Sequence, residues 1–347
     1  MSALPVRAPD LPRLRVDYSQ VPLPALLDDD RVLAVFGFGS AAPENGDPRY
    51  LRVALEPGGP APLEVWRGHA PVRCGRDGAV AWSDDGALLF AAMEVDEQAL
   101  AEDTRDDDIE RAAKTAYAGL SAFADARGYP HLLRMWNYLD GITAGEGDAE
   151  RYRRFCVGRA RGLGAFDPGA LPAATAIGRV DGVRRLQVFL LAARVAGVPL
   201  ENPRQVSAYR YPRQYGPQPP SFARAMLPPA GSAMPLLLSG TAAVVGHESR
   251  HADCVAAQLD ETLANFDSLL VAARARAPHL PAHFGADTWL KVYVRDASEM
   301  ARVRTLLDAR LDPAVKRVVL HAAICRRELR IEIDGVHGAA MDGDVAG

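Results

Sequence analysis

The sequence predicts an α/β (α+β) fold in which two β-α-β domains are fused in one chain. Three observations predict it. The 347 residues exceed what one hydrophobic core usually holds, so two domains are expected. The order strand, loop, long helix, strand occurs twice along the chain, and each of the two helices carries one apolar stripe. We therefore expect mixed sheets packed by amphipathic helices, with a pocket between the halves.

The beginning of the chain predicts a surface arm followed by strands. Residues 1–30 contain many prolines and no sustained periodicity, so we expect an arm that lies over the domain. The segments 31–40, 49–55 and 62–68 are β-rich and bounded by Gly, Pro and Asp, as strands of hairpins are. Within them, FGFGS (36–40) contains GxG but lacks the third glycine and the acidic residue of a dinucleotide site. A hairpin loop in an antiparallel sheet is the better interpretation.

The repeated unit follows once in each half of the chain. The units are strand 87–95, helix 108–126 and strand 131–139 in the first half, and strand 235–245, a helix from near Asp253 and strand 288–296 in the second. The apolar stripes run through Ile109, Ala113, Ala116, Leu120 and Phe123, and through Val255, Leu259, Leu263, Phe266 and Leu270. Each helix is therefore expected to lie across its own sheet.

Between the two units lie a helix around 149–163, the apolar stretch 185–194 and a proline-rich segment at 209–225. The last holds several tyrosines and arginines in a stiff loop, which positions polar side chains at low entropic cost. The expected organisation is an N-terminal arm (1–30), an N-terminal domain (31–150), connecting helices with a substrate loop (151–230) and a C-terminal domain (231–340).

The composition favours a globular protein that acts on a small molecule. Apolar residues make up 48% of the chain and charged residues 24%, and no run is long enough for a membrane span. The first residues lack the features of a secretory signal, so we expect a cytoplasmic protein. A net charge of −4 without a lysine-arginine run argues against nucleic acid as a partner. Four scattered cysteines without a CxxC pair indicate reduced thiols.

One segment, GHESRH (246–251), matches the HExxH signature of zinc hydrolases. That signature binds metal because its two histidines lie one turn apart on a helix. Here His247 and His251 directly follow an apolar strand, whereas helical periodicity begins only near Asp253. We favour a polar connection between strand and helix, and we keep a zinc hydrolase as an alternative of another class.

Two sets of residues are candidates for chemistry on their spacing alone. In the C-terminal strand 325–335, Glu332 alternates with apolar residues and points away from the core side, although most such glutamates are merely solvated. Tyr152 and Arg159 lie seven residues apart on a predicted helix, hence on one face. They could hold one anion together, or belong to a solvated arginine-rich face.

The segment from about 234 to 335 resembles the YjgF/RidA fold family. The motifs are LLLSGTAAVV, AAQLDETLANFDSLLVAA, KVYVRDASEMARV and RELRIEID. In that family an arginine fifteen residues before the glutamate of the closing strand holds a substrate carboxylate. The resemblance therefore implies this role for Arg317, fifteen residues before Glu332.

Over about two-thirds of the chain the closer resemblance is to the chorismatases, which look like two such domains fused behind an N-terminal extension. The motifs are MWNYLDGI, GEGDAERYRRFCVGRA, PRQVSAYRYP, SGTAAVVGHESRH and CRRELRIEIDG. The resemblance implies that Glu332 protonates the methylene of chorismate's enolpyruvyl ether. It also implies substrate contacts for Tyr152, Arg159, Tyr211 and Arg224, with Tyr209, Arg210 and Arg213 as alternatives within the loop.

Two further positions bear on the product. The resemblance identifies Gly240 and Cys325 as the pair that distinguishes 3-hydroxybenzoate-forming chorismatases from hydrolytic ones that form a dihydrodiol. A small Gly240 leaves space for the substrate to tilt, and Cys325 displaces the hydrolytic water. We expect 3-hydroxybenzoate and pyruvate, with or without 4-hydroxybenzoate, from a monomer or small homo-oligomer that needs no metal or cofactor. The alternatives are the hydrolytic reaction and a non-catalytic metabolite-binding protein.

Overall fold

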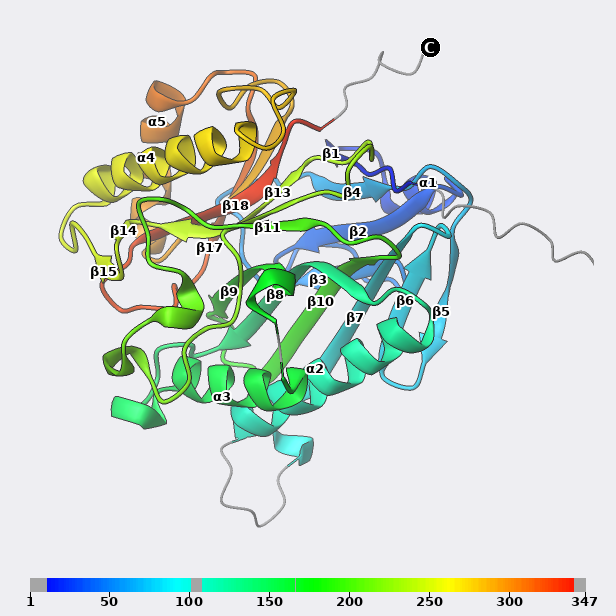
Figure 1. Cartoon of the computed structure of the whole chain (residues 1–347), viewed down its shortest axis with the longest axis horizontal. Helices are drawn as coiled ribbons and strands as arrows, with labels where there is room; N and C mark the ends of the chain where they lie inside the picture. The colour runs from blue at the N-terminus through cyan, green and yellow to red at the C-terminus, as the bar shows by residue number, and fades with distance from the viewer. Residues whose placement is uncertain (1–10, 101–107, 166, 340–347) are drawn as a thin grey trace, which may run out of the picture.

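The computed structural model describes residues 11–100, 108–165 and 167–339 (Figure 1). In this part of the chain three larger sheets lie between two layers of helices. Helices α2 and α3 cover the outer face of one six-stranded sheet, and α4 and α5 cover that of the other. No helix among the described residues is both long and apolar enough to cross a membrane.

The first six-stranded sheet is built from the middle of the N-terminal half. In spatial order its strands are β5 (Arg73–Asp77), β6 (Val80–Asp84), β7 (Leu88–Asp96), β10 (Arg185–Ala193), β8 (His131–Asp140) and β9 (Ala173–Arg179). Only β8 and β9 pair in parallel. Helix α2 (Asp108–Ala126) packs on the sheet, and α3 (Arg151–Leu163) packs on α2.

The second six-stranded sheet repeats this order. Its strands are β11 (Val198–Leu200), β12 (Ala225–Leu227), β13 (Leu236–Ala242), β18 (Ile331–His337), β16 (Thr288–Val294) and β17 (Lys316–His321), with helices α4 (Val255–Arg274) and α5 (Met300–Arg310). Again only the pair at the last edge, β16 and β17, is parallel. The duplication of a β-α-β unit with mixed sheets is thus confirmed.

The expected domain limits differ from those of the sheets. The first sheet ends with β10 at Ala193 and the second begins with β11 at Val198. Residues 151–193 therefore complete the first unit rather than connect two domains. The apolar run at 185–194 is β10, a central strand covered on both faces, and such strands lack the alternation that would identify them in a sequence.

A four-stranded sheet forms the third layer. Its order is β1 (Arg15–Ser19), β4 (Leu63–Arg67), β2 (Val32–Phe38) and β3 (Tyr50–Val53), with the short helix α1 (Leu23–Leu27) before β2. The expected arm thus contributes a strand, and Val16 is buried. Residues 1–10 of the arm lie outside the described part.

The prediction of a hairpin at 36–40 and of an antiparallel opening is wrong in one respect. Strand β2 pairs antiparallel with β4 but parallel with β3. Two consecutive strands can pair in parallel only if the chain returns to the end of the sheet at which the first strand began. The loop 39–49 makes this return, held by Arg52, whose guanidinium donates to the carbonyl oxygens of Gly39 and Ser40.

The inner faces of the three sheets share one core. Trp66 of β4, Trp136 of β8 and Phe189 of β10 lie at its centre, and the rings of Trp136 and Phe189 stack with centroids 5.0 Å apart. The two six-stranded sheets adjoin where β9 lies beside β13. Backbone bonds between Gly178 and Ala323, with N to O distances of 2.7 and 2.9 Å, join them there. This junction carries the main cavity.

Candidate active site

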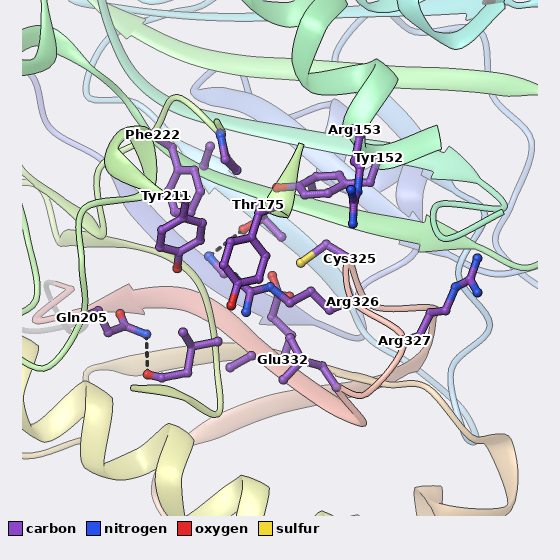
Figure 2. Close-up of a pocket in the computed structure, with 18 of the residues that line it drawn as sticks. Tyr152, Arg153, Thr175, Gln205, Tyr211, Phe222, Cys325, Arg326, Arg327 and Glu332 are labelled. Atoms are coloured by element: carbon purple, nitrogen blue, oxygen red, sulfur yellow. Dashed lines mark hydrogen bonds between the residues drawn. The ribbon is translucent and has the colours of Figure 1, made fainter. Parts of the chain in front are cut away.

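A cavity of about 400 Å³ opens at the junction of the two units. Figure 2 shows side chains from α3, β9, β18 and the loops around 205–222 and 325–327 converging on it. Of the eight residues that the sequence singles out, seven line this cavity: Tyr152, Arg159, Tyr211, Arg224, Gly240, Cys325 and Glu332. The two units therefore contribute to one site, as expected.

The eighth residue, Arg317, is not among the residues that line the cavity, in contrast to the prediction that it binds a substrate carboxylate there. Arg317 lies on β17 and its guanidinium forms an ion pair with Asp308. It lines a separate hollow beside residues 57–62. The reason is topological, because β17 is the edge strand of the second sheet and β16 separates it from β18.

The Glu332 carboxyl is the central group of the cavity. It projects from β18, where the backbone pairs with Ala242 on one side and Tyr293 on the other. Glu332 is only 5% exposed. Burial first, and then the negative charge of Asp334, raise the pKa of Glu332 to about 8 against the opposing effect of nearby arginines. At neutral pH this side chain is therefore a carboxylic acid that can donate a proton.

Gly240 provides the space in which this carboxyl lies. A Cβ built on Gly240 would overlap with Oε1 of Glu332, and it would lie 3.3 Å from Cγ2 of Thr175. The sequence interpretation assigned this space to the substrate. The structure shows instead that the acid itself occupies it, so any side chain at this position would displace Glu332.

Two buried arginines supply positive charge. Arg159 and Arg224 are 2% and 4% exposed, and neither guanidinium forms an ion pair with a carboxylate of the described residues, while the charge of Arg224 opposes the rise that burial causes in the pKa of Glu201. Arg159 donates to the carbonyl oxygen of Ser221, and Arg224 donates to the carbonyl oxygen of Val206 at 2.9 Å. Because a buried cation is costly without a negative partner, the pair is suited to binding a carboxylate ligand.

Two tyrosines stand beside these cations. The Tyr211 hydroxyl accepts a hydrogen bond from Arg224 at 2.7 Å, which leaves its own proton available for a ligand. Tyr152 lies on α3 with its ring stacked on Phe155, and burial raises the pKa of its phenol well above the usual value. Tyr152 is therefore a neutral hydrogen-bond donor.

The alternatives within the loop lie elsewhere. Arg213 forms an ion pair with Asp148 at the surface, and the Arg210 guanidinium lies 5.6 Å from the Tyr209 ring. Tyr209, Arg210 and Arg213 are not among the residues that line the cavity. Their positions favour Tyr211 and Arg224 as the ligand-binding residues of the loop.

Arg326 is a cavity cation that the sequence interpretation missed. Its guanidinium lies 4.1 Å from the Tyr215 ring centre and donates to the His247 carbonyl oxygen at 2.8 Å. We expected a strand from residue 325, but β18 begins at Ile331, so 325–330 is a loop at the cavity. The alternation of side chains along a strand therefore does not extend to Arg326.

Cys325 lies beside this arginine with its thiol near Glu332 (Figure 2). Burial first, and then the Glu332 charge, raise the pKa of the Cys325 thiol. It therefore remains a thiol, a weakly polar group of modest size, and not a thiolate nucleophile.

The HExxH segment does not have the geometry of a zinc site. Residues 244–249 form a small hairpin of β14 (Val244–Val245) and β15 (Glu248–Ser249), so the two histidines are not one helical turn apart. His247 contacts the Tyr215 hydroxyl at 3.2 Å, and His251 contacts Glu261 at 3.1 Å. Within the described ranges no group of three His, Cys, Asp or Glu side chains could hold a metal ion.

Comparisons with known proteins agree with this geometry. The family model "Chorismatase FkbO/Hyg5-like, N-terminal" matches residues 64–192. A chorismatase of Streptomyces hygroscopicus is 35% identical over 90% of this chain and 91% of its own, and a 3-hydroxybenzoate synthase of the same species is 34% identical over 79% and 80%. A crystal structure of a chorismatase superposes with a TM-score of 0.79 at 33% identity, covering 94% of this chain and 98% of that one.

Proposed function

This chain belongs to the chorismatase family, and we propose that it is an enzyme that converts chorismate to 3-hydroxybenzoate and pyruvate. The observation that carries the proposal is the buried Glu332 carboxyl, whose pKa burial raises, in a cavity that buried arginines also line. A cavity of about 400 Å³ is of the size that binds small molecules.

Chorismate has groups that complement these side chains. It is a cyclohexadiene that carries two carboxylates, a hydroxyl and an acid-labile enol ether. Arg159 and Arg224 are buried cations for carboxylate groups, and Tyr152 and Tyr211 offer hydroxyl donors. Glu332 then supplies the one group that must react, an acid of suitable pKa.

The proposed reaction consists of proton transfers, cleavage of the bond between ring carbon C3 and the ether oxygen, and a shift of the hydroxyl oxygen from C4 to C3. Glu332 protonates the methylene carbon, which creates an oxocarbenium centre and weakens the bond between the ring and the ether oxygen. As the side chain leaves C3 as pyruvate, the hydroxyl oxygen on C4 attacks C3, so that an epoxide forms and the hydroxyl proton is released. The C4–O bond then opens as the oxygen takes up a proton, and C3 loses its hydrogen as a proton when the ring becomes aromatic. Chorismate contains the same atoms as hydroxybenzoate plus pyruvate, so the proton returned to Glu332 balances the cycle and no oxidant is needed.

Pyruvate release is the first test of this proposal. Purified protein treated with a chelator is expected to release one pyruvate for each chorismate consumed. A protein that binds chorismate without consuming it would be a metabolite-binding protein, and activity lost with the chelator and restored by zinc would indicate a zinc hydrolase. Either result overturns the proposal.

Cys325 bears on the choice of product. We propose that its thiol fills the space from which water would attack the activated side chain, so that an aromatic product forms in place of a dihydrodiol. Cys325→Ala is expected to shift the product ratio towards the dihydrodiol by about ten-fold, since one water position is opened. Chromatography of the products measures the shift, with Cys254→Ala, an exposed cysteine away from the cavity, as the control. An unchanged ratio would contradict this role.

The pH dependence follows from the acid at the centre of the site. Glu332 must be protonated to act, and its pKa is raised to about 8. The rate is therefore present below that value and is lost as the pH rises through about 8. A profile of kcat between pH 4 and 10 measures the midpoint, and a midpoint near the usual pKa of a glutamate would contradict the proposal.

A further inference from the structure

A β-bulge underlies the position of the Glu332 carboxyl. Along the pairing of β13 with β18, Leu238 lies opposite Gly335 and Thr241 lies opposite Ile333. Two residues, one of them Gly240, therefore face the single residue Asp334. The bulge brings Gly240 over Glu332, where no Cβ fits.

Thr175 of β9 holds this bulge from the other unit. Its hydroxyl oxygen accepts a hydrogen bond from the Gly240 N–H at 3.0 Å. The same hydroxyl donates to Oδ2 of Asp334 at 2.7 Å. The Thr175 side chain also lines the cavity (Figure 2). The Thr175 hydroxyl thus connects the backbone of Gly240, next to the Glu332 carboxyl, with the carboxylate of Asp334.

Asp334 is itself fixed by donors from both units. Its Oδ2 accepts from the Arg134 guanidinium, the Trp136 indole and the Tyr293 hydroxyl, each at 3.1 Å. Arg134 also donates to Thr175 at 2.5 Å, and the Lys291 ammonium, which is paired with Glu64, lies 3.7 Å from Oδ1 of Asp334. Arg134 and Asp334 are both fully buried. A buried ion pair is a poor means of gaining stability, since apolar residues of equal volume usually serve as well.

We propose that Asp334 is a positioning residue for the reaction: anchored by Arg134, it fixes through the Thr175 hydroxyl the bulge at Gly240 that accommodates the Glu332 carboxyl. This inference rests on the proposed function, because it assigns a role relative to the acid of that reaction. The buried ion pair of Arg134 and Asp334 thereby has a role in the reaction.

The charge of Asp334 acts on the same carboxyl. Residues two apart on a strand share a face, so Asp334 and Glu332 lie side by side. After burial, the Asp334 charge is the largest cause that raises the pKa of Glu332. The other charged or titratable groups around Glu332 are Arg134 of β8, Arg224 before β12, Tyr152 of α3, Tyr293 of β16, and Cys325 and Arg326 of the loop before β18.

The direction in which Asp334→Asn shifts the pKa of Glu332 follows from the charges of these groups. The substitution removes a negative charge while the arginines stay, so the ionised form of Glu332 is favoured and its pKa falls. The alkaline midpoint of kcat is expected to move down by about one pH unit. Difference infrared titration of the Glu332 carboxyl, assigned with Glu332→Gln, is expected to show the same shift without any turnover.

Tyr138→Phe is the matched control. Its hydroxyl contacts Tyr293 at 3.1 Å and so belongs to the same buried polar side chains, one step further from Asp334. This variant removes a hydroxyl from the buried polar side chains without changing Asp334, Thr175 or Gly240. The midpoint of the kcat profile and the midpoint of the infrared titration of Glu332 are both expected to stay unchanged. A folded Asp334→Asn protein with wild-type midpoints in kcat and in the infrared titration would overturn the proposal.

Thr175→Val and Thr175→Ser test the same role if Asp334→Asn does not fold. Valine keeps the shape of threonine but removes the hydroxyl, so kcat is expected to fall about ten-fold with little change in KM. Serine restores the hydroxyl and is expected to restore kcat. Wild-type kcat in a folded Thr175→Val protein would overturn the proposal. If the wild type does not consume chorismate, the proposed function fails, and the infrared midpoints still decide the role of Asp334.

Discussion

Glu332→Gln is expected to lower kcat for chorismate about a thousand-fold, within the range that a general acid contributes. Glutamine keeps the size of the side chain and its contacts in the cavity, but it cannot give up a proton of suitable acidity. Because Arg159 and Arg224 are the proposed contacts of the chorismate carboxylates, Kd is expected to change less than about three-fold. Pyruvate release measures kcat, and calorimetric titration with chorismate measures Kd.

Glu248→Gln is the matched control for this variant. Glu248 lies on the β14–β15 hairpin, where it pairs with Arg250 at 3.0 Å, and it is the glutamate that a zinc hydrolase would use as its base. The proposed reaction predicts that Glu248→Gln has wild-type activity. Inactivation by Glu248→Gln together with an active Glu332→Gln would reverse the assignment of the two residues.

Gly240→Ala is expected to lower kcat about a hundred-fold, since a displacement of about 1 Å at a reacting group has an effect of this size. The added Cβ would overlap with Oε1 of Glu332, so the carboxyl must rotate away from its position. Gly285→Ala is the control, because a Cβ there lies 3.9 Å from the closest atom, Oδ1 of Asp287. Thermal unfolding separates loss of activity from loss of fold. Wild-type kcat in a folded Gly240→Ala protein would contradict this view of the acid's environment.

The elements with strong periodicity could be predicted from the sequence. The helix expected at 108–126 is α2 at Asp108–Ala126, and the strand expected at 131–139 is β8 at His131–Asp140. The apolar stripe of α2 packs in one core cluster with one face of β8, and the periodicity of such a stripe is visible in a short stretch of sequence. The parallel pairing of β2 with β3 was not predicted, because the partner of a strand is determined by distant parts of the chain.

The residues of the cavity also divide into those that the sequence could predict and those that it could not. Glu332 lies in a motif on a regular strand, and its place could be inferred from alternation and resemblance. Arg317 was inferred from a spacing within one unit, whereas the cavity lies between two units and Arg317 is not among the residues that line it. Arg326 lies in a loop, and Thr175 contributes through a bond to the other unit, so neither has a local signal.

The most direct test of the account is a chromatographic analysis of the products after wild-type protein and Glu332→Gln are each incubated with chorismate. The wild type is expected to yield 3-hydroxybenzoate and pyruvate in equal amounts, and the variant is expected to leave chorismate intact. Unchanged chorismate with the wild type, or equal product formation by the variant, would contradict the central claim that Glu332 is the acid of a chorismate-converting enzyme.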